Sequence, residues 1–460
     1  MEDGARDLTA PVAVIGGGYA GCAAAITLAE AGVRVLLLEA GAVLGGRARR
    51  VVRDGLPLDN GQHLLLGAYR ATLGILARLP GGYVTTDLLR RPLTVVPFGA
   101  AQPEALTLVA PRAPGRLGLA VALLSARGLT WHERLANLRF LRALAQGGYQ
   151  RPRAERVSKL LAPLPPRVVR QLWEPLCLAA LNTPIRQASA QIFANVIREA
   201  FGAGGGASDM LVAATDLSAL LPERVATDLR QRGSEVRLQA TAQVAAHGRD
   251  GVTLVVRGAA VRVAATIVAV GPHQLRHAFA PEALDAHPPL AAAIDVVDGL
   301  AFEPIVTVWL GYTTRAAMRA PLARLDDAPG QWVFDRPDIL ARRTAGTPAP
   351  FAQLLSVVIS ASGPHLGWPH ERVVRAADEQ LRRLQPARGA AVWSCVIAEK
   401  RATYACTPDR VRLPGPRLSP GLYVAGDYVD AEFPATLEAA VRSGIAAAEA
   451  LLADRRQAAD

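Results

Sequence analysis

The sequence predicts an α/β protein in which a discontinuous Rossmann-like domain with a parallel sheet carries an inserted α+β domain. Three observations point to this fold class. A strand, a glycine-rich turn, a helix and a second strand follow one another between residues 11 and 39. An apolar strand and an Ala-rich helix stand near the C-terminus at 421–452, and a helix, a glycine turn and a strand lie between them at 217–238. Alternation of this kind is typical of a parallel sheet covered by helices.

The N-terminal unit carries a nucleotide-binding signature. Gly16, Gly18 and Gly21 follow the apolar run PVAVI in G-x-G-x-x-G spacing, and the strand VRVLLLE ends at Glu39. The first glycine of such a unit permits a tight turn, the second lets the backbone approach a pyrophosphate, and the third lets the helix pack on the strand. The pyrophosphate then lies at the helix N-terminus, where free N–H groups favour negative charge. An acid at the position of Glu39 holds ribose hydroxyls and disfavours a 2′-phosphate, which leaves NAD and FAD.

The segments that follow favour FAD. GGRARR at 45–50 and GLYVAGD at 421–427 resemble the two halves of the flavin site in the superfamily of amine oxidases and phytoene desaturases. The resemblance implies that the first loop closes over the phosphate and ribityl region, and that Asp427 lies beside the ribityl chain. In the next helix Thr436 is the expected N-cap and Glu438 lies in the first turn. The N-terminus of this helix would point at the carbonyl edge of the flavin.

Two further segments are more specific. DNGQHLLLGAYR at 59–70 and LWEPLCLAALNTP at 172–184 resemble the hydroxysqualene dehydroxylases of hopanoid biosynthesis, also called squalene-associated FAD-dependent desaturases. The resemblance runs over nearly the whole chain and implies that reduced FAD removes the allylic hydroxyl of hydroxysqualene to give squalene. His63 is the candidate proton donor, because the unperturbed pKa of imidazole is about 6.5. Alternatively, Gln62 and His63 hold the loop against the flavin by hydrogen bonds, and Asp59 is expected to cap the turn.

These motifs define a set of expected site residues. The expected FAD-binding residues are Gly16, Gly18, Tyr19, Ala20, Gly21, Glu39, Ala40, Gly45, Gly46, Arg47, Asn60, Gly61, Gln62, Gly426, Asp427, Thr436, Leu437 and Glu438. The candidate catalytic residues are His63 and Gln62, and the expected substrate-lining residues are Trp173, Leu176, Leu181 and Asn182. No metal site is expected, because His132, His247 and His277 fit no ligand spacing and are expected at the surface.

The same motifs suggest a division into domains. The FAD-binding domain is expected at 1–84, 205–281 and 396–460, and a domain that faces the substrate and the membrane at 85–204 and 282–395.

Composition and charge bear on the partners. Apolar residues make up 51% of the chain, and no apolar run is long enough to span a membrane. These apolar residues are therefore expected to form a large core, an apolar tunnel or a surface patch. The formal net charge of +11 reflects either an Arg-rich composition alone or attraction to an anionic surface. Without a nucleic-acid motif, lipid is the favoured anionic partner, and the apolar, Arg-containing stretch 115–145 is either an ordinary helix pair or a lipid contact.

The N-terminus and the cysteines bear on location. Residues 1–10 contain acids and no apolar core of a signal peptide, and the cysteines show no C-x-x-C spacing. We therefore expect a cytoplasmic protein with reduced cysteines, peripheral on the inner face of the membrane. Its expected partners are hydroxysqualene, a long apolar isoprenoid, and the upstream enzymes of squalene synthesis.

Three other functions remain open from the sequence. The flavin motifs do not separate reductive dehydroxylation from oxidative desaturation by a carotenoid-type desaturase. An amine oxidase usually needs an aromatic cage near the flavin, and only Tyr428 and Phe433 lie close to Asp427 in the sequence. A prenyl-binding carrier of the same fold would bind no flavin, which the intact glycines and acids argue against. Product analysis and the colour of the protein distinguish these functions.

Overall fold

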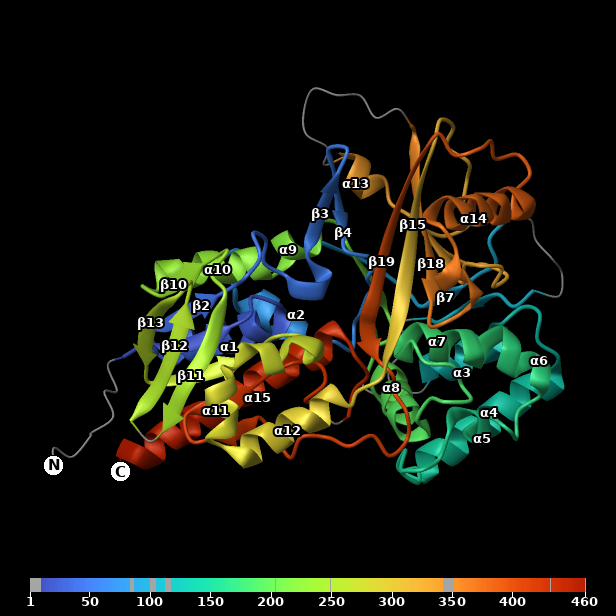
Figure 1. The fold of residues 1–460 in the computed structure, drawn as a ribbon. Coiled ribbons are helices and arrows are strands. Elements are labelled where there is room, and N and C mark those ends of the chain that lie inside the picture. The colour runs from blue at the N-terminus through green and yellow to red at the C-terminus, as the bar shows by residue number, and fades with distance from the viewer. Residues whose placement is uncertain are drawn as a thin grey trace, which may run out of the picture.

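Segments from both ends of the chain lie together in one lobe, and the middle of the chain forms most of a second lobe (Figure 1). In the second lobe a sheet lies above a group of helices in this view. The computed structural model describes residues 10–82, 87–99, 105–111, 117–202, 204–248, 250–341, 351–430 and 432–459.

A largely parallel sheet forms the centre of the first lobe. Its strands have the order β10 (Glu235–Arg237), β2 (Val35–Leu38), β1 (Val12–Ile15), β14 (Ala265–Val268), β21 (Leu422–Val424) and β20 (Arg417–Ser419). Neighbouring strands are parallel except for β20, which runs antiparallel to β21. Strands far apart in the sequence therefore become neighbours at the centre of the sheet, and the expected α/β class with a parallel sheet is confirmed.

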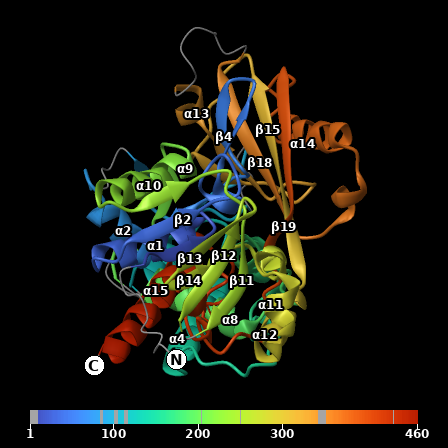
Figure 2. The same ribbon diagram turned by 60° about the vertical axis from the view of Figure 1, so that its left-hand side comes forward.

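Alternating residues of β1 face two different layers. Val12 and Val14 belong to a core with the helices on one face, whereas Ala13 and Ile15 belong to a core with an antiparallel sheet on the other face. This alternation follows from the two-residue period of a strand. The helices are α1 (Tyr19–Glu30), α2 (Arg70–Arg78), α9 (Leu217–Leu220), α10 (Pro222–Gln231) and α15 (Leu437–Ala459). The antiparallel sheet, visible in Figure 2, consists of β11 (Ala242–Gly248), β12 (Gly251–Val256) and β13 (Ala259–Val263), with α11 (Pro281–Asp285) and α12 (Pro288–Asp298) nearby.

An antiparallel sheet forms the upper part of the second lobe. Its strands have the order β16 (Leu322–Arg324), β17 (Trp332–Asp335), β18 (Gln353–Ser360), β15 (Phe302–Tyr312) and β19 (Trp393–Tyr404). We call it the second sheet. It contacts α14 (His370–Leu384) and α13 (Pro337–Ala341), and α13 in turn contacts a hairpin of β3 (Arg50–Arg53) and β4 (Leu56–Asp59). The hairpin brings the segment after the nucleotide motif to the second sheet.

Helices form the lower part of the second lobe. They are α3 (Leu117–Ser125), α4 (Trp131–Gln146), α5 (Val157–Leu160), α6 (Pro166–Val168), α7 (Glu174–Leu181) and α8 (Ala190–Gly202), with a π-helical turn at Val169–Trp173. Short strands connect the lobes: β5 (Leu65–Leu66), β6 (Leu88–Arg91) and β9 (Met210–Ala213) pair with one another, and β7 (Thr94–Val95) pairs with β8 (Leu108–Val109). In the part of the chain that the structure describes, no helix is long and apolar enough to cross a membrane.

Candidate flavin and substrate site

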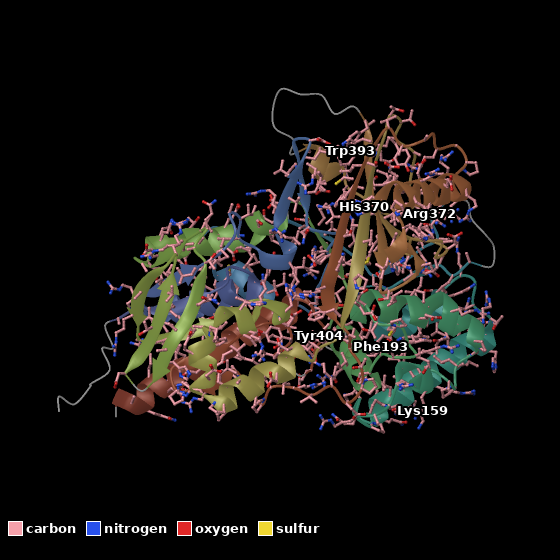
Figure 3. The ribbon with its side chains drawn as sticks, in the orientation of Figure 1. Lys159, Phe193, His370, Arg372, Trp393 and Tyr404 are labelled. Atoms are coloured by element: carbon pink, nitrogen blue, oxygen red, sulfur yellow. The ribbon has the colours of Figure 1, made fainter. Side chains whose placement is uncertain are left out.

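A cavity of about 1210 Å³ lies between the two lobes. Its polar end is lined by the turns after β1 and β2, by residues 45–50 and by the start of α15. Its apolar end is lined by β7, α7, α8 and the second sheet. Figure 3 shows Phe193 of α8 and Tyr404 of β19 where the helices meet this sheet. The cavity therefore joins a polar surface of backbone groups to an apolar chamber.

The three glycines of the nucleotide motif differ in what a side chain would meet. Gly16 has φ of +108°, which favours glycine, and a Cβ there would lie 2.5 Å from the carbonyl oxygen of Ala269. A Cβ on Gly21 would lie 1.9 Å from the carbonyl oxygen of Gly16, so this glycine permits the close contact of α1 with β1. A Cβ on Gly18 would meet nothing closer than 3.7 Å. Gly18 thus leaves open space at the N-terminus of α1, where a diphosphate fits.

Glu39 is held by the backbone of this cradle. Its carboxylate oxygens accept hydrogen bonds from the N–H groups of Gly17 and Gly41, each at 2.7 Å. A carboxylate has about four lone-pair positions, so acceptor capacity remains for hydroxyl donors in the cavity. The arrangement fits the ribose of a dinucleotide.

Arg47 joins the two ends of the chain at the polar end of the cavity. It lies in a 3-10 turn, Gly46–Ala48, and its guanidinium donates to Asp427 at 2.5 Å and to the carbonyl of Ala402 at 2.8 Å. Asp427 is almost fully buried, whereas Arg47 keeps about a third of its side chain exposed. Although burial opposes the charge, Asp427 raises the pKa of Arg47. This pair can present both a cation and a carboxylate oxygen to a polar ligand.

The loop from Asp59 to His63 is fixed by a buried network. Gln62 Oε1 accepts from Arg336 at 2.9 Å and from Ser356 at 3.0 Å, and its Nε2 donates to the carbonyl of His63 at 2.9 Å. Asp59 accepts from the N–H of Leu217 at 2.8 Å. The polar atoms of Gln62 therefore bind the loop to the second sheet, which favours a positioning role over proton transfer for this side chain.

Arg336 is the centre of that network. It is 1% exposed and makes two hydrogen bonds to Asp338, at 3.0 and 2.8 Å. A bidentate contact of this kind fixes the guanidinium plane as well as its position. The residue stands just after β17, far from Gln62 in the sequence, so sequence reasoning missed it.

His63 lines the cavity and is enclosed by protein. Its buried Nδ1 has no hydrogen-bond partner among the described atoms. Burial lowers the pKa of His63 to about 4; the backbone of Gly61 opposes this shift, and the nearby charges of Arg47 and Arg336 add to it. The side chain is a neutral imidazole in this environment.

The start of α15 completes the polar end. Thr436 caps the helix, because its hydroxyl accepts from the N–H of Ala439 at 3.2 Å. Glu438 bonds elsewhere: it accepts from the N–H groups of Ala71 and Thr72 at the start of α2, at 2.8 and 3.0 Å. Burial raises the pKa of Glu438. It stabilises the junction of α2 with α15 and does not line the cavity.

Most of the expected site residues are brought together. The expected residues that line the cavity are Gly16, Gly18, Tyr19, Ala20, Glu39, Ala40, Gly45, Gly46, Arg47, Asn60, Gly61, Gln62, His63, Trp173, Leu176, Asn182, Gly426, Asp427, Thr436 and Leu437. Gly21, Leu181 and Glu438 are not among the lining residues that the structure describes. Leu181 is buried in the helical core instead, so its assignment to the substrate pocket is corrected.

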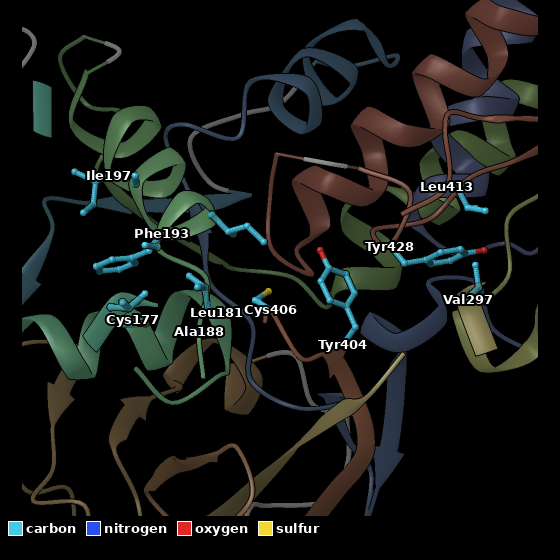
Figure 4. Packing of buried hydrophobic residues seen from close by; sticks show 14 of the residues in the cluster. Cys177, Leu181, Ala188, Phe193, Ile197, Val297, Tyr404, Cys406, Leu413 and Tyr428 are labelled. Atoms are coloured by element: carbon cyan, nitrogen blue, oxygen red, sulfur yellow. The ribbon is translucent and has the colours of Figure 1, made fainter. Parts of the chain in front are cut away.

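The apolar end of the cavity is built by helices that also pack against one another. Figure 4 shows Phe193 and Ile197 of α8 with Cys177 and Leu181 of α7 in this packing. Phe193 and Ile197 line the cavity, whereas Cys177 does not. Asn182 lines the cavity, but its amide donates to Thr403 at 3.0 Å and accepts from Ala361 N–H at 2.8 Å. It holds the end of α7 against the second sheet.

Sequence reasoning also missed polar residues around the cavity. Thr241, His273, Gln274 and Glu399 line it, and they come from segments without a recognisable motif. The one sequence signal for His273 is the turn Gly271–Pro272, which follows β14 and directly precedes this residue. A further correction concerns His247, which is buried against His287 with ring centroids 4.0 Å apart, not at the surface. Among the described residues no group of three or more metal-ligating side chains occurs.

Comparison with known proteins agrees with this geometry. A sequence model of the flavin containing amine oxidoreductases matches residues 19–452, and the chain belongs to this family. The family membership makes a flavin the cofactor. A hydroxysqualene dehydroxylase of Rhodopseudomonas palustris is 30% identical, with 97% of this chain and 99% of the relative covered. One of Sinorhizobium fredii is 29% identical, with 96% and 98% covered. Within the larger family, the chain belongs with the hydroxysqualene dehydroxylases.

A solved structure shows the same fold. The crystal structure of an oxidoreductase from Methanosarcina mazei superposes with a TM-score of 0.69 at 14% identity, and the match covers 96% of this chain and 100% of that one.

Proposed function

We propose that this protein is an FAD-dependent hydroxysqualene dehydroxylase, which removes the allylic hydroxyl of hydroxysqualene and yields squalene. The observation that carries the proposal is the continuous cavity, which joins the cradle of Gly18 and Glu39 to an apolar chamber in a chain of this family. The overall change consumes one hydride and one proton and releases water. Reduced FAD, when bound, supplies the hydride from N5.

FAD fits the residues at the polar end better than a mononucleotide does. The open space at Gly18 and the carboxylate of Glu39 suit the diphosphate and ribose of an adenine dinucleotide. Asp427, Arg47 and the capped start of α15 lie along the same cavity and suit the ribityl chain and the ring. The proposed FAD contacts are the expected FAD-binding residues that line the cavity, with Gly21 acting through helix packing.

The apolar end suits a long isoprenoid. Leu176, Phe193, Ile197, Trp332 and Val358 line it. Each buried CH₂ group contributes about 0.8 kcal/mol, so a C30 chain leaves a bilayer only for a comparably apolar cavity. The walls also exclude water, which strengthens the electrostatic interactions of any charge that develops near Arg47 and Asp427.

The proton for the leaving water needs a donor from the chain, and His63 is our candidate. His63 faces the cavity; its imidazolium form would donate the proton and return to the neutral imidazole that its lowered pKa favours, and solvent would restore the proton after turnover. Gln62 and Arg336 hold the backbone of His63 in place through the network described above. We assign Gln62 a positioning role.

The decisive test is anaerobic incubation of the reduced holoprotein with hydroxysqualene. We expect squalene as the product, and deuterium from flavin labelled at N5 should appear in it when exchange with solvent is slower than turnover. Unlabelled squalene under that condition would exclude direct hydride transfer. Conversion of squalene to more unsaturated products by the oxidised enzyme would establish a desaturase, and a colourless protein that binds prenyl chains would establish a carrier.

Location and domain division complete the proposal. We place the protein in the cytoplasm, peripheral on the inner face of the membrane, with access to the enzymes that form hydroxysqualene. We propose an FAD-binding domain at 1–84, 205–281 and 396–460 and a substrate domain at 85–204 and 282–395, with two boundaries shifted. Helices α11 and α12 lie with the first lobe, and β19 lies as a whole in the second sheet. Limited proteolysis tests this division. We expect the two parts to be protected from cleavage as separate units, with the shared cavity between them.

A further inference from the structure

Exposed apolar side chains gather on α3, α4 and the neighbouring strand β8. They are Val109, Val121, Leu124, Trp131 and Leu135, and we call them the α3–α4 patch. These five are half of the ten large apolar side chains that the described residues expose. Trp131 is the most exposed of them, at 67%. Helix α3 contacts both α4 and β8, and exposed apolar side chains gathered on neighbouring elements mark a site of interaction with a partner or a membrane.

The patch is a preformed surface. The guanidinium of Arg134 donates to the carbonyls of Leu124 and Ala126 at 2.6 and 2.8 Å, which fixes the end of α3 against the start of α4. The same group lies 4.8 Å from the centre of the Trp131 ring. Thr130 and Glu133 form a capping box at the start of α4. The exposed Trp131 ring is thus presented by two helices that are fixed to each other.

Apart from the buried Glu133, the ionised side chains of α3, α4 and the turn between them are all arginines. The only acid between residues 105 and 154 is Glu133, which is buried and bonded to Arg167 at 2.9 and 2.8 Å. Arg127, Arg139 and Arg142 are exposed on the same two helices and the turn between them. Within the described residues, Arg139 and Arg142 have no carboxylate partner. A Trp beside apolar groups and unpaired arginines is the composition that binds the interface of an anionic bilayer.

The patch lies next to a wall of the cavity. β8 contributes Val109 to the patch and pairs with β7, whose Thr94 and Val95 line the cavity. α3 packs on β8, and its end is joined to the start of β8 by paired backbone hydrogen bonds between Thr107 and Arg127, at 3.1 and 2.9 Å. Two strands therefore separate the apolar surface from the apolar chamber.

We propose that the α3–α4 patch is the surface with which the protein docks on an anionic phospholipid membrane. Trp131, Leu135, Leu124 and Val121 enter the headgroup region, while Arg127, Arg139 and Arg142 contact phosphate groups. The stretch 115–145, expected either as a helix pair or as a lipid contact, is thereby narrowed to these side chains, and residues 115 and 116 lie outside the described part of the chain. If the protein docks through this patch, the substrate reaches the apolar chamber from the membrane side. This consequence rests on the proposed function.

Vesicle sedimentation of the flavin-loaded protein tests the docking surface. The probes are vesicles of phosphatidylcholine alone and of phosphatidylcholine mixed with phosphatidylglycerol. Wild type should bind the anionic vesicles more strongly, and less so at high salt, because charges are screened beyond about 8–10 Å. The triple variant Leu124→Gln, Trp131→Gln, Leu135→Gln should lose binding by about tenfold or more. Arg139→Gln with Arg142→Gln should weaken binding only to the anionic vesicles.

Matched controls separate the outcomes. Val411→Gln and Val392→Gln change exposed apolar residues elsewhere, and Arg456→Gln removes an exposed charge elsewhere; all three should bind as wild type. All variants should keep the flavin absorbance of wild type, since the changed side chains are at the surface. Unchanged vesicle binding by the triple variant would overturn the proposal. So would a wild-type dimer that the triple variant converts to monomers, since the patch would then be an interface between two copies.

Turnover distinguishes a failure of docking from a failure of the proposed function. The triple variant should convert hydroxysqualene in detergent micelles at the wild-type rate and lose activity only when the substrate is in vesicles. If wild type binds vesicles through the patch but converts no hydroxysqualene in either form, the docking surface stands and the proposed function does not.

Discussion

The two ends of the cavity are built in different ways. The polar end uses backbone groups, a few glycines and single charged residues at fixed positions, such as Gly18, Glu39 and Asp427. The apolar end uses ordinary core residues from β7, α7, α8 and the second sheet, with Asn182 to fix their junction. A charged cofactor needs hydrogen-bond and charge partners at specific positions, whereas an apolar chain needs only sufficient volume and the absence of water. The predictions below test this contrast, from the largest expected effect to the smallest.

The largest effects are expected at two glycines of one motif. Gly21→Val should prevent folding, because even the Cβ would lie 1.9 Å from the carbonyl oxygen of Gly16. Gly18→Val should yield folded protein without flavin, because its side chain would enter open space where the diphosphate approaches. Circular dichroism and flavin absorbance per chain distinguish the two variants. Full flavin occupancy in Gly18→Val would show that the nucleotide is bound elsewhere.

A large loss of stability is expected when Arg336 is replaced. Arg336→Met removes a buried cation from Gln62 and from the carboxylates of Asp338 and Asp59, which costs about 3–5 kcal/mol. The control is Arg383→Met, which breaks an exposed pair with Asp326 and should cost at most about 1 kcal/mol. Urea denaturation of both variants gives the comparison. Equal losses would mean that the buried network does not hold the loop.

His63 should affect turnover without a loss of flavin. If His63 is the general acid, His63→Ala lowers kcat by about 10²–10⁴-fold, whereas Gln62→Ala acts by disordering the loop and weakens flavin binding as well. Single-turnover kinetics and flavin titration separate the two. Near-normal turnover in His63→Ala would place the proton donor elsewhere, with Glu399 and His273 as the next residues on the cavity wall.

The lowered pKa of His63 has a consequence for stability against pH. The folded pKa of about 4 lies below the unfolded value, so the unfolded chain binds the extra proton first as pH falls. The contribution of His63 is complete above about pH 6.5 and is lost as pH falls toward 4. His63→Gln should therefore lose less stability than wild type between these values in denaturation measurements. Parallel curves would indicate that the pKa of His63 is the same in the folded and the unfolded protein.

The smallest effect is expected at the cap of α15. Thr436→Ala removes the acceptor of the Ala439 N–H and should cost about 1 kcal/mol. Thr436→Ser keeps the hydroxyl and should restore most of the loss, as thermal unfolding can measure. Flavin affinity should fall slightly in Thr436→Ala if the start of this helix faces the ring, and an unchanged affinity would remove Thr436 from the flavin contacts.

The residues expected at the polar end line one cavity, and their positions could be predicted because the determinants are local. The glycines, Glu39 and Asp427 stand at the ends of strands that are recognisable as apolar runs, and parallel strands bring such ends to one edge of a sheet. Glu438 was placed correctly in the first turn of its helix, but its partner is the start of α2, which only the folded chain brings near. The preference for acids in the first turn of a helix predicted the position of Glu438, but it could not predict its hydrogen-bond partners.

The apolar end was less predictable for two physical reasons. Leu176 and Leu181 are five residues apart, so on a helix they point about 140° apart, and only Leu176 faces the cavity. Both are equally apolar, and composition alone cannot tell a lining residue from a core residue. Arg336 reaches Gln62 across 274 positions, and a lone Arg before a proline gives no local signal of burial. The residues that position the loop therefore become visible only with the second sheet in place.

The order of strands in the central sheet also bears on how the protein is made. β1 pairs with β14, and β14 pairs with β21, so the middle of the sheet joins residues 12–15, 265–268 and 422–424. The ion pair of Arg47 with Asp427 likewise joins the two ends of the chain, at the polar end of the cavity. When only the first 400 residues of the chain have been synthesised, Asp427 is still missing and only one half of the flavin site is present. The complete flavin site therefore forms only after β21 and Asp427 have been synthesised.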